Sequence, residues 1–232
     1  MTKSYRQFCP VAKASEIFAE RWTPLLIREL LCGSHRFNEL RRGLPMMSPS
    51  LLAQRLRQLV DAGLVYDADS RDGNTEYRLT EAGAALRPVV ESLGVWGKQW
   101  VQREVTEDDL DAGLLMWDIH RRLHIDRMPE RRTVLRFELV DAPARQRFYW
   151  LVIDRGRVDI CLKNPGFEED VCIRSRLLTL TRIWLGEVPW ESAVRSGHIE
   201  LQGAPDLVRQ IGRWLALSLF AEMDAAPGPG VT

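Results

Sequence analysis

The sequence predicts an α+β protein with two domains, and three features of the chain support this. Apolar residues in the first half mostly recur at helical spacing, whereas the second half contains several segments of strand length. Residues 103–113, between these halves, are acidic and poor in large apolar side chains. A chain of 232 residues, 45% hydrophobic and 28% charged, can build a core in each domain. We expect a mainly helical domain over residues 1–103, a linker over residues 104–113, and an α+β domain over residues 114–232, whose antiparallel sheet is covered by helices.

The first helices of the chain are marked by apolar stripes and by their ends. A helix around residues 10–20 leads into "RWTPLLIRELL", where four apolar residues form a stripe before Gly33. The segment "RFNELRRGL" predicts a short helix from about residue 36 to residue 42, and "PMMS" predicts a tight turn after it. The start of this half is therefore a run of three helices.

Residues 48–59, "SPSLLAQRLRQL", form the helix with the clearest start. Ser48 can accept hydrogen bonds from the first backbone N–H groups, and Pro49 suits the first helical turn. Leucines recur on one face, and Gly63 follows the end of the helix. The other faces carry no carboxylate before Asp61. Such a helix favours a polyanion as its partner.

The pattern then changes to short strands. Two strand candidates, "LVYDAD" and "TEYRLT", flank "SRDGN", a turn rich in Asp, Gly and Asn. Thr80 caps a following helix, which we expect to run through "GAALRPVVESLGVWGKQWV" with a bend or break at Pro88 and Gly94. Three helices, the last two joined by a short turn, and then a two-stranded ribbon are the order of a winged helix-turn-helix domain.

The positive charge of the chain also lies in this domain. Residues 1–103 hold 15 Lys/Arg against 11 Asp/Glu, a net of +4, and residues 104–232 hold 17 against 21, a net of −4. The first turns of the helix over residues 48–59 fit a DNA major groove, which is about 12 Å wide. The alternative is a solvated helix face. The predicted contacts are Ser48, Ser50 and Gln54 to base edges or phosphates, Arg55 and Arg57 to phosphate or guanine, Arg36, Arg41 and Arg42 to the DNA backbone, and Arg71 and Arg78 of the ribbon to an adjacent groove.

These segments together resemble a known family. The stretch from Cys9 to residue 65, followed by "EYRLTEAG", resembles the HxlR family of bacterial winged-helix regulators, relatives of MarR, over about residues 9–100. The resemblance implies a homodimer on a pseudo-palindromic DNA operator, with half-sites about one helical turn apart. It also implies dimer contacts from the first helix and from the helix after the wing, where Trp96 and Trp100 lie. The long second half departs from the usual short members.

The second half predicts an antiparallel sheet. Strand candidates are "RRTVLRFELV", "RFYWLVIDRG", "RVDICLKN" and "EDVCIRS". A helix "RLLTLTRIWLGE", a strand "HIELQG" and a helix that begins at Pro205 follow them. Pairing the third strand with the fourth as a hairpin places apolar opposite apolar and acid opposite base, with Cys161 facing Cys172 as two reduced thiols. The paired residues would be Ile160 with Ile173, Leu162 with Val171, and Asp159 with Arg174.

The end of the chain carries a second resemblance. The segment "SGHIELQGAPDLVRQIGRWLAL" looks like the end of a sterol carrier protein type-2 domain, over about residues 114–222. This resemblance implies a tunnel between sheet and helices that holds a hydrophobic small molecule. The alternative is ordinary core packing. The aromatic residues that could line the tunnel are Trp150, Trp184, Trp190, Trp214, Phe148, Phe167 and Phe220.

Other candidate chemistry is sparse. His120 and His124 stand four apart on a predicted helix, but the arginines between them would repel a cation, so we expect a surface pair and no metal. Cys9 matches a position that serves as a redox or electrophile sensor in some HxlR relatives, and structural packing is the alternative. The sequence has no GxSxG, HExxH, P-loop or dinucleotide motif. We expect no catalytic residues and no cofactor.

The leading hypothesis is a cytoplasmic, dimeric transcription factor whose second domain alters DNA binding when an apolar effector binds. The N-terminus has no apolar stretch that could serve as a signal peptide, and the apolar run over residues 214–221 is far shorter than the roughly 20 residues of a membrane span. The alternatives are a thiol-switch regulator acting through Cys9, and an enzyme or lipid carrier whose winged helix contacts protein.

Overall fold

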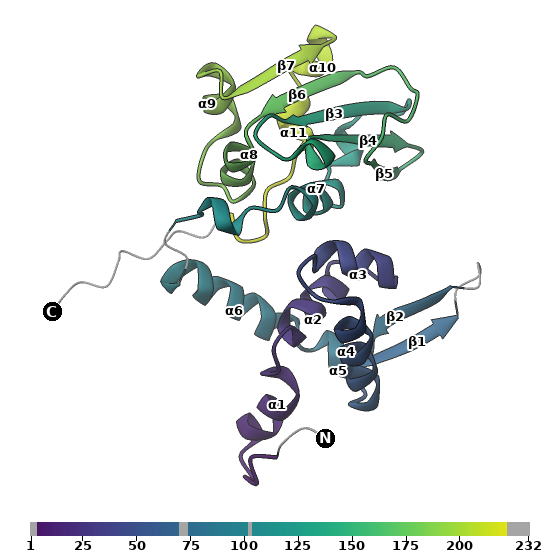
Figure 1. Cartoon of the computed structure of the whole chain (residues 1–232), viewed down its shortest axis with the longest axis vertical. Coiled ribbons are helices and arrows are strands. Elements are labelled where there is room, and N and C mark those ends of the chain that lie inside the picture. The colour runs from purple at the N-terminus through teal and green to yellow at the C-terminus, as the bar shows by residue number, and fades with distance from the viewer. Residues whose placement is uncertain (1–3, 70–73, 102–103, 222–232) are drawn as a thin grey trace, which may run out of the picture. The chain divides into compact units, whose positions relative to one another are not determined.

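The computed structural model describes residues 4–69, 74–101 and 104–221. The chain divides into two compact units, an N-terminal unit up to Gly94 and a C-terminal unit from Val95 (Figure 1). A helical unit with a two-stranded ribbon precedes a unit of sheet and helices, so the predicted α+β fold class is confirmed. The predicted limits of 1–103 and 114–232, with a linker over 104–113, stay a prediction.

The N-terminal unit has the predicted order of helices and ribbon. Its buried core is built from leucines and other aliphatic residues of the helices, among them Leu26, Leu40, Leu52 and Leu56. The two strands pair antiparallel, from Val65 opposite Leu79 to Asp69 opposite Thr75. The turn that joins them, and with it Arg71, lies outside the described residues. The elements are α1 (Pro10–Phe18), α2 (Thr23–Leu31), α3 (Phe37–Gly43), α4 (Pro49–Asp61), β1 (Val65–Asp69), β2 (Thr75–Leu79) and α5 (Glu81–Ala84), and α6 (Arg87–Trp100) begins in this unit and continues past its last residue, Gly94.

The helix after the wing is interrupted just before Pro88, which is one of the two places predicted. α5 ends at Ala84, and α6 begins after two intervening residues with Pro88 in its first turn, where the missing N–H group costs nothing. α6 then continues past Gly94 without interruption to Trp100. The predicted break at Gly94 is therefore wrong, since the glycine is accommodated within a regular helix.

The "LTEAG" segment holds the end of the wing against the end of α4. The Thr80 hydroxyl accepts a hydrogen bond from the Gly83 N–H group at 3.1 Å and donates one to the Gly63 carbonyl at 2.7 Å. The Thr80 N–H group donates to the Leu64 carbonyl at 3.0 Å. A Cβ atom on Gly83 would lie 2.1 Å from that same carbonyl oxygen, so α5 can pack this closely only with glycine at position 83.

The C-terminal unit is a five-stranded sheet with helices on one face (Figure 1). The strand order is β5-β4-β3-β6-β7, and every neighbouring pair is antiparallel except β3 with β6, which is parallel. The elements are η1 (Glu107–Asp109), α7 (Ala112–His120), η2 (Ile125–Arg127), β3 (Thr133–Leu139), η3 (Ala144–Gln146), β4 (Phe148–Asp154), β5 (Arg157–Cys161), β6 (Val171–Ser175), α8 (Leu177–Trp184), α9 (Trp190–Arg195), β7 (Ile199–Gly203), α10 (Pro205–Val208) and α11 (Ile211–Trp214).

The predicted hairpin of β5 with β6 is wrong. β5 pairs with β4, whereas β6 pairs with β3 and β7, so two strands separate the segments that were expected to be neighbours. Cys161 lies opposite Trp150, and Cys172 lies between Arg136 and Gln202. The predicted partners of β5 and β6, and the facing cysteines, therefore do not meet, because β4 and β3 occupy the positions between them.

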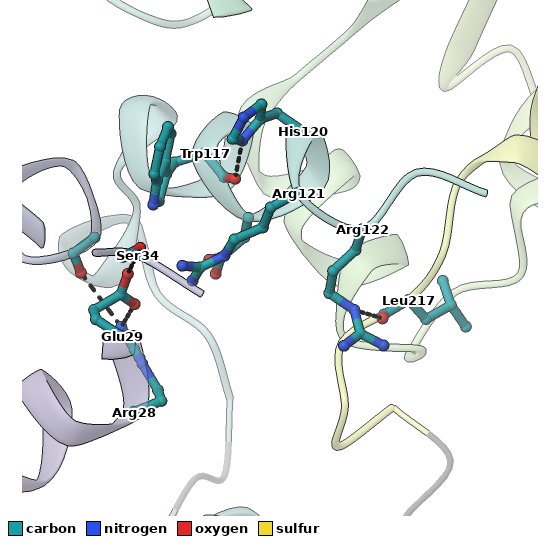
Figure 2. Close-up of polar contacts among 10 residues, drawn as sticks. Arg28, Glu29, Ser34, Trp117, His120, Arg121, Arg122 and Leu217 are labelled. Carbon is teal, nitrogen blue, oxygen red and sulfur yellow. Dashed lines mark hydrogen bonds and ion pairs between the residues drawn. The ribbon is translucent and has the colours of Figure 1, made fainter. Parts of the chain in front are cut away.

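Two predicted helices of this unit are shorter than expected. The segment that begins at Pro205 forms two short helices separated at Arg209 and Gln210, and its last helix ends at Trp214. α7 ends at His120, and His124 lies beyond it, so the two histidines do not share a helix face. The His120 ring stacks on the ring of Trp117 with centroids 4.4 Å apart, and its Nδ1 lies 2.9 Å from the Trp117 carbonyl (Figure 2).

Two further properties bear on function. Within residues 4–69, 74–101 and 104–221, no cluster of three or more His, Cys, Asp or Glu side chains is placed to hold a metal ion. In the same residues, no helix is long and apolar enough to cross a membrane.

Candidate nucleic-acid interface

α4 carries an exposed polar stripe opposite its buried leucines. Ser50, Gln54 and Arg57 are exposed and lie at i, i+4 and i+7, which places them on one face of the helix. Leu52, Leu56 and Leu59 are each 1% exposed or less, and they pack the opposite side of the helix into the core. The 13 residues of α4 span about 20 Å. The exposed stripe is therefore a rigid surface with no acidic side chain before Asp61.

The start of α4 is fixed by its cap. The Ser48 hydroxyl accepts a hydrogen bond from the Leu51 N–H group at 3.3 Å, and Pro49 occupies the first turn. Ser48 is exposed, and its hydroxyl also stabilises the start of the helix. This hydroxyl lies 3.3 Å from the Ser50 hydroxyl. Two of the predicted contact residues are thus held close together at the N-terminus of the helix.

A cleft of about 650 Å³ opens where α3 turns into α4. Its lining includes two exposed arginines at the end of α3 and no acidic residue. The N-terminus of a helix favours anions because its backbone N–H groups are not used within the helix. The cleft therefore combines two sources of positive potential. Its lining residues are Asn38, Arg41, Arg42, Pro45, Met46, Met47, Ser48 and Pro49. Asn38, Pro45, Met46 and Met47 were not among the predicted contacts.

The arginines of the wing are paired with an acid that the sequence analysis did not single out. Glu76 binds Arg78 at 2.8 Å and Arg36 at 3.6 Å. The hydrogen bond from Arg78 is the largest cause that lowers the pKa of the Glu76 carboxyl. Both arginines are exposed, but their charge is partly neutralised by the Glu76 carboxylate.

Arg55 lies away from the exposed stripe, and its predicted contact with DNA stays a prediction. The residue is 9% exposed, and its Nη1 atom lies 3.1 Å from Glu20 Oε2 and 2.7 Å from Gln58 Oε1. Two residues along a helix rotate a side chain by about 200°, so Arg55 and Arg57 point to nearly opposite sides of α4. Only Arg57 remains available at the surface.

The predicted ligand-binding aromatics lie on both faces of the sheet. Successive residues of a strand alternate in direction, so Trp150 and Phe148 point away from the face that carries Tyr149. They pack with Val134 and Val152 in a small cluster outside the helix-covered core. Trp214 is inside that core with 0% exposure, and Trp184 and Trp190 pack against it. These residues do not surround one common space.

The remaining aromatic candidates and Cys9 lie near the surface. Phe167 is 41% exposed and stacks under the Arg132 guanidinium, with 4.2 Å from Cζ to the ring centroid. Phe220 is partly buried. The Cys9 thiol is free and partly exposed at the start of α1. The roles of these residues in ligand binding or sensing stay predictions.

The N-terminal unit is similar to known regulators. The HxlR-like helix-turn-helix family matches residues 17–105. The uncharacterized HTH-type transcriptional regulator YvaP of Bacillus subtilis is 35% identical over 102 residues, which are 41% of this chain and 91% of that protein. The chain belongs to the HxlR-like helix-turn-helix family.

Other proteins are also similar to this HxlR-like chain. The uncharacterized HTH-type transcriptional regulator Rv3095 of Mycobacterium tuberculosis is 41% identical over 97 residues, which are 40% of this chain and 60% of that protein. Among solved structures, the redox regulator HypR in its oxidized form is 32% identical, covers 42% of this chain and 100% of its own, and has a TM-score of 0.38. The reduced form of the transcriptional regulator YodB from B. subtilis is 29% identical, covers 43% of this chain and 100% of its own, and has a TM-score of 0.38.

Proposed function

We propose that this HxlR-like chain is a DNA-binding transcriptional regulator whose α4 enters the major groove. The observation that carries the proposal is the exposed, acid-free stripe of Ser50, Gln54 and Arg57 beside a cleft that contains Arg41 and Arg42. Relatives that are named HTH-type transcriptional regulators support it.

The stripe has the chemistry needed to read base edges. Gln54 carries an amide that can bind adenine through two hydrogen bonds, and Arg57 carries a guanidinium that can bind guanine in the same manner. Arg41 and the N–H groups at the start of α4 would bind phosphate oxygens and set the position of the helix. Direct reading and backbone contact are thus assigned to different side chains.

We further propose that the regulator acts as a homodimer through α6. Four large apolar side chains of this helix are between 46% and 56% exposed. Their spacing of i, i+4, i+7 and i+11 forms a continuous stripe, which is rare on the surface of a monomer. A second copy of the chain would cover the stripe and present a second α4 to a half-site one helical turn away. The residues are Val89, Leu93, Trp96 and Trp100.

The test compares two arginine variants on a DNA site selected from a random duplex library. Arg57→Ala should lower affinity about tenfold to a hundredfold and relax the preference at one base pair. Arg41→Ala should weaken binding to all sequences alike and reduce the salt slope by about one. Arg87→Ala, at the exposed start of α6, is the control and should bind as the unchanged protein does. Equal affinity of all three variants, or a selected site that none of them alters, contradicts the proposal.

The role of the C-terminal unit stays a prediction. Control of DNA binding by a hydrophobic small molecule predicts that native mass spectrometry detects a co-purified apolar compound, and that the compound changes the affinity for DNA. Thiol sensing through Cys9 predicts instead that Cys9→Ser abolishes the response to oxidants. The lipid-carrier alternative predicts that no duplex is selected from the library.

A further inference from the structure

A second cleft lies on a different side of α4 from the exposed stripe. It has a volume of about 370 Å³, within the range of small-molecule sites. It is formed by α1, the start of α2 and the second half of α4, all within the N-terminal unit. The lining residues are Glu16, Ile17, Glu20, Thr23, Arg55, Gln58, Leu59, Asp61 and Ala62.

Two buried polar atoms in this lining have no hydrogen-bond partner among the described residues. They are the Thr23 hydroxyl, in a residue 1% exposed, and the Nε atom of Arg55, in a residue 9% exposed. Buried polar groups in proteins are nearly always hydrogen-bonded. The Arg55 Nε–H group is a donor only, whereas the hydroxyl both donates and accepts. Together they offer a place for an acceptor oxygen.

The charges around the cleft disfavour an anion in that place. The Arg55 guanidinium is already balanced by Glu20 at 3.1 Å. Glu16 accepts hydrogen bonds at 2.8 Å from the Ser4 hydroxyl and from the Tyr5 N–H group, and the Ser4 bond is the largest cause of its lowered pKa. The Glu16 carboxylate therefore stays ionised beside the cleft.

The mouth of the cleft favours a cation instead. Asp61 is exposed at the last position of α4 and forms no ion pair within the described part of the chain. Ala62, the C-cap, also lines the cleft, and the C-terminal end of a helix carries partial negative charge. A positively charged group near Asp61 would be attracted by the Asp61 carboxylate and by the partial negative charge at the end of α4.

We propose that this cleft binds a small organic amine that carries a carbonyl group. The carbonyl oxygen accepts hydrogen bonds from Arg55 Nε–H and the Thr23 hydroxyl, and the ammonium group binds Asp61. Ile17 and Leu59 contact the apolar part of the molecule. The site thus uses the arginine that the sequence assigned to DNA.

The position of the cleft connects it to α4. Arg55 and Gln58 lie in the cleft and on the same helix as Gln54 and Arg57, so an occupied cleft would alter how α4 is held. An effect on DNA affinity rests on the proposed function. Binding itself does not, and it is measured without DNA.

The test follows the Arg55 Nε–Hε signal of the ¹⁵N-labelled full chain by NMR, assigned by its loss in Arg55→Lys. Three probes share a phenyl body. Phenylalaninamide has both groups, 2-phenylethylamine lacks the carbonyl, and 3-phenylpropanoate is an anion. Phenylalaninamide should produce a saturable shift, 2-phenylethylamine a shift that saturates at higher concentration, and 3-phenylpropanoate none.

Variants separate the two contacts. Thr23→Val, which keeps the shape of the side chain, and Asp61→Asn should each weaken phenylalaninamide about fivefold. Asp67→Asn, an exposed acid on β1 outside the cleft, is the matched control and should bind normally. A crystal structure of the soaked protein with only water on Thr23 and Arg55, a second copy of the chain filling the cleft, or equal binding of all three probes overturns the proposal.

Discussion

Replacing Gly83 by alanine should destabilise the N-terminal unit, although alanine is the better helix former. The new Cβ atom would lie 2.1 Å from the Leu64 carbonyl oxygen and 3.0 Å from Leu79 Cδ2. Relief requires a shift of roughly 1 Å between two backbone segments, because the oxygen cannot rotate away as a flexible side chain would. The same oxygen accepts the Thr80 N–H bond at 3.0 Å, so moving it also lengthens that hydrogen bond.

The magnitude follows from these opposing effects. Overpacking a rigid site costs about 1–3 kcal/mol, and loss of a backbone hydrogen bond costs about 1 kcal/mol. Replacing glycine by alanine in a helix stabilises it by about 1 kcal/mol, which offsets part of this cost. We expect the free energy of unfolding of this unit to fall by about 2 kcal/mol, which corresponds to roughly thirtyfold faster exchange of the amides that open with it.

The assay is native-state hydrogen exchange of the full chain, read by mass spectrometry on peptides from α4 and β1, so that the C-terminal unit does not contribute. Gly97→Ala is the matched control, because a Cβ at Gly97 meets no atom within 4 Å and the residue lies inside α6. Gly97→Ala should slow amide exchange in α6, because alanine stabilises a helix by up to about 1 kcal/mol relative to glycine. Unchanged or slower exchange of α4 and β1 in Gly83→Ala refutes the reasoning.

Three other predictions concern single groups. Ser48→Ala removes the cap of α4 and should cost about 1 kcal/mol, seen as faster exchange in the first turn of that helix. Burial, with a smaller contribution from Asp111, raises the pKa of Tyr149 to about 12 from its ordinary 10.0. The folded state therefore holds this proton more tightly, and its stabilising effect, complete below pH 10.0, should be lost as the pH rises towards 12, as alkaline unfolding curves and ultraviolet titration of the phenol would show. Burial and the hydrogen bond to Glu169 raise the pKa of Cys172 to about 11, so iodoacetamide should modify this thiol slowly at neutral pH and faster in Glu169→Gln.

The sequence predicted α4 and the ribbon well because their signals are local. The capping hydroxyl of Ser48, the proline that follows it and the leucine spacing each depend on fewer than five neighbouring residues. The ion pairing of Arg78 and Arg36 was harder to predict, because Glu76 of β2 also pairs with Arg36, which precedes α3. That pairing depends on contacts between β2 and the start of α3, which no spacing in the sequence encodes.

Strand order in the C-terminal unit could not be predicted in the same manner. The expected hairpin of β5 with β6 satisfied cross-strand chemistry, yet the chain pairs β6 in parallel with β3. Alternation predicts which residues share a face of a strand, but it does not select the neighbouring strand. For the same reason Trp150 and Trp214 seemed equally suited to one tunnel, although the sheet separates them.

The different positions of Arg55 and Arg57 could have been predicted from the leucine spacing of α4. Leu52, Leu56 and Leu59 define the buried face, and a residue three after Leu52 and one before Leu56 must lie beside that face. Arg55 therefore enters the structure next to the core and is stable there because Glu20 and Gln58 bind its guanidinium. Arg57, two positions later, is carried to the opposite side and stays in solvent. Charge alone assigned both arginines to DNA, whereas helix geometry separates them: Arg57 is exposed, and Arg55 lines a cleft with its Nε–H donor unpaired within the described residues.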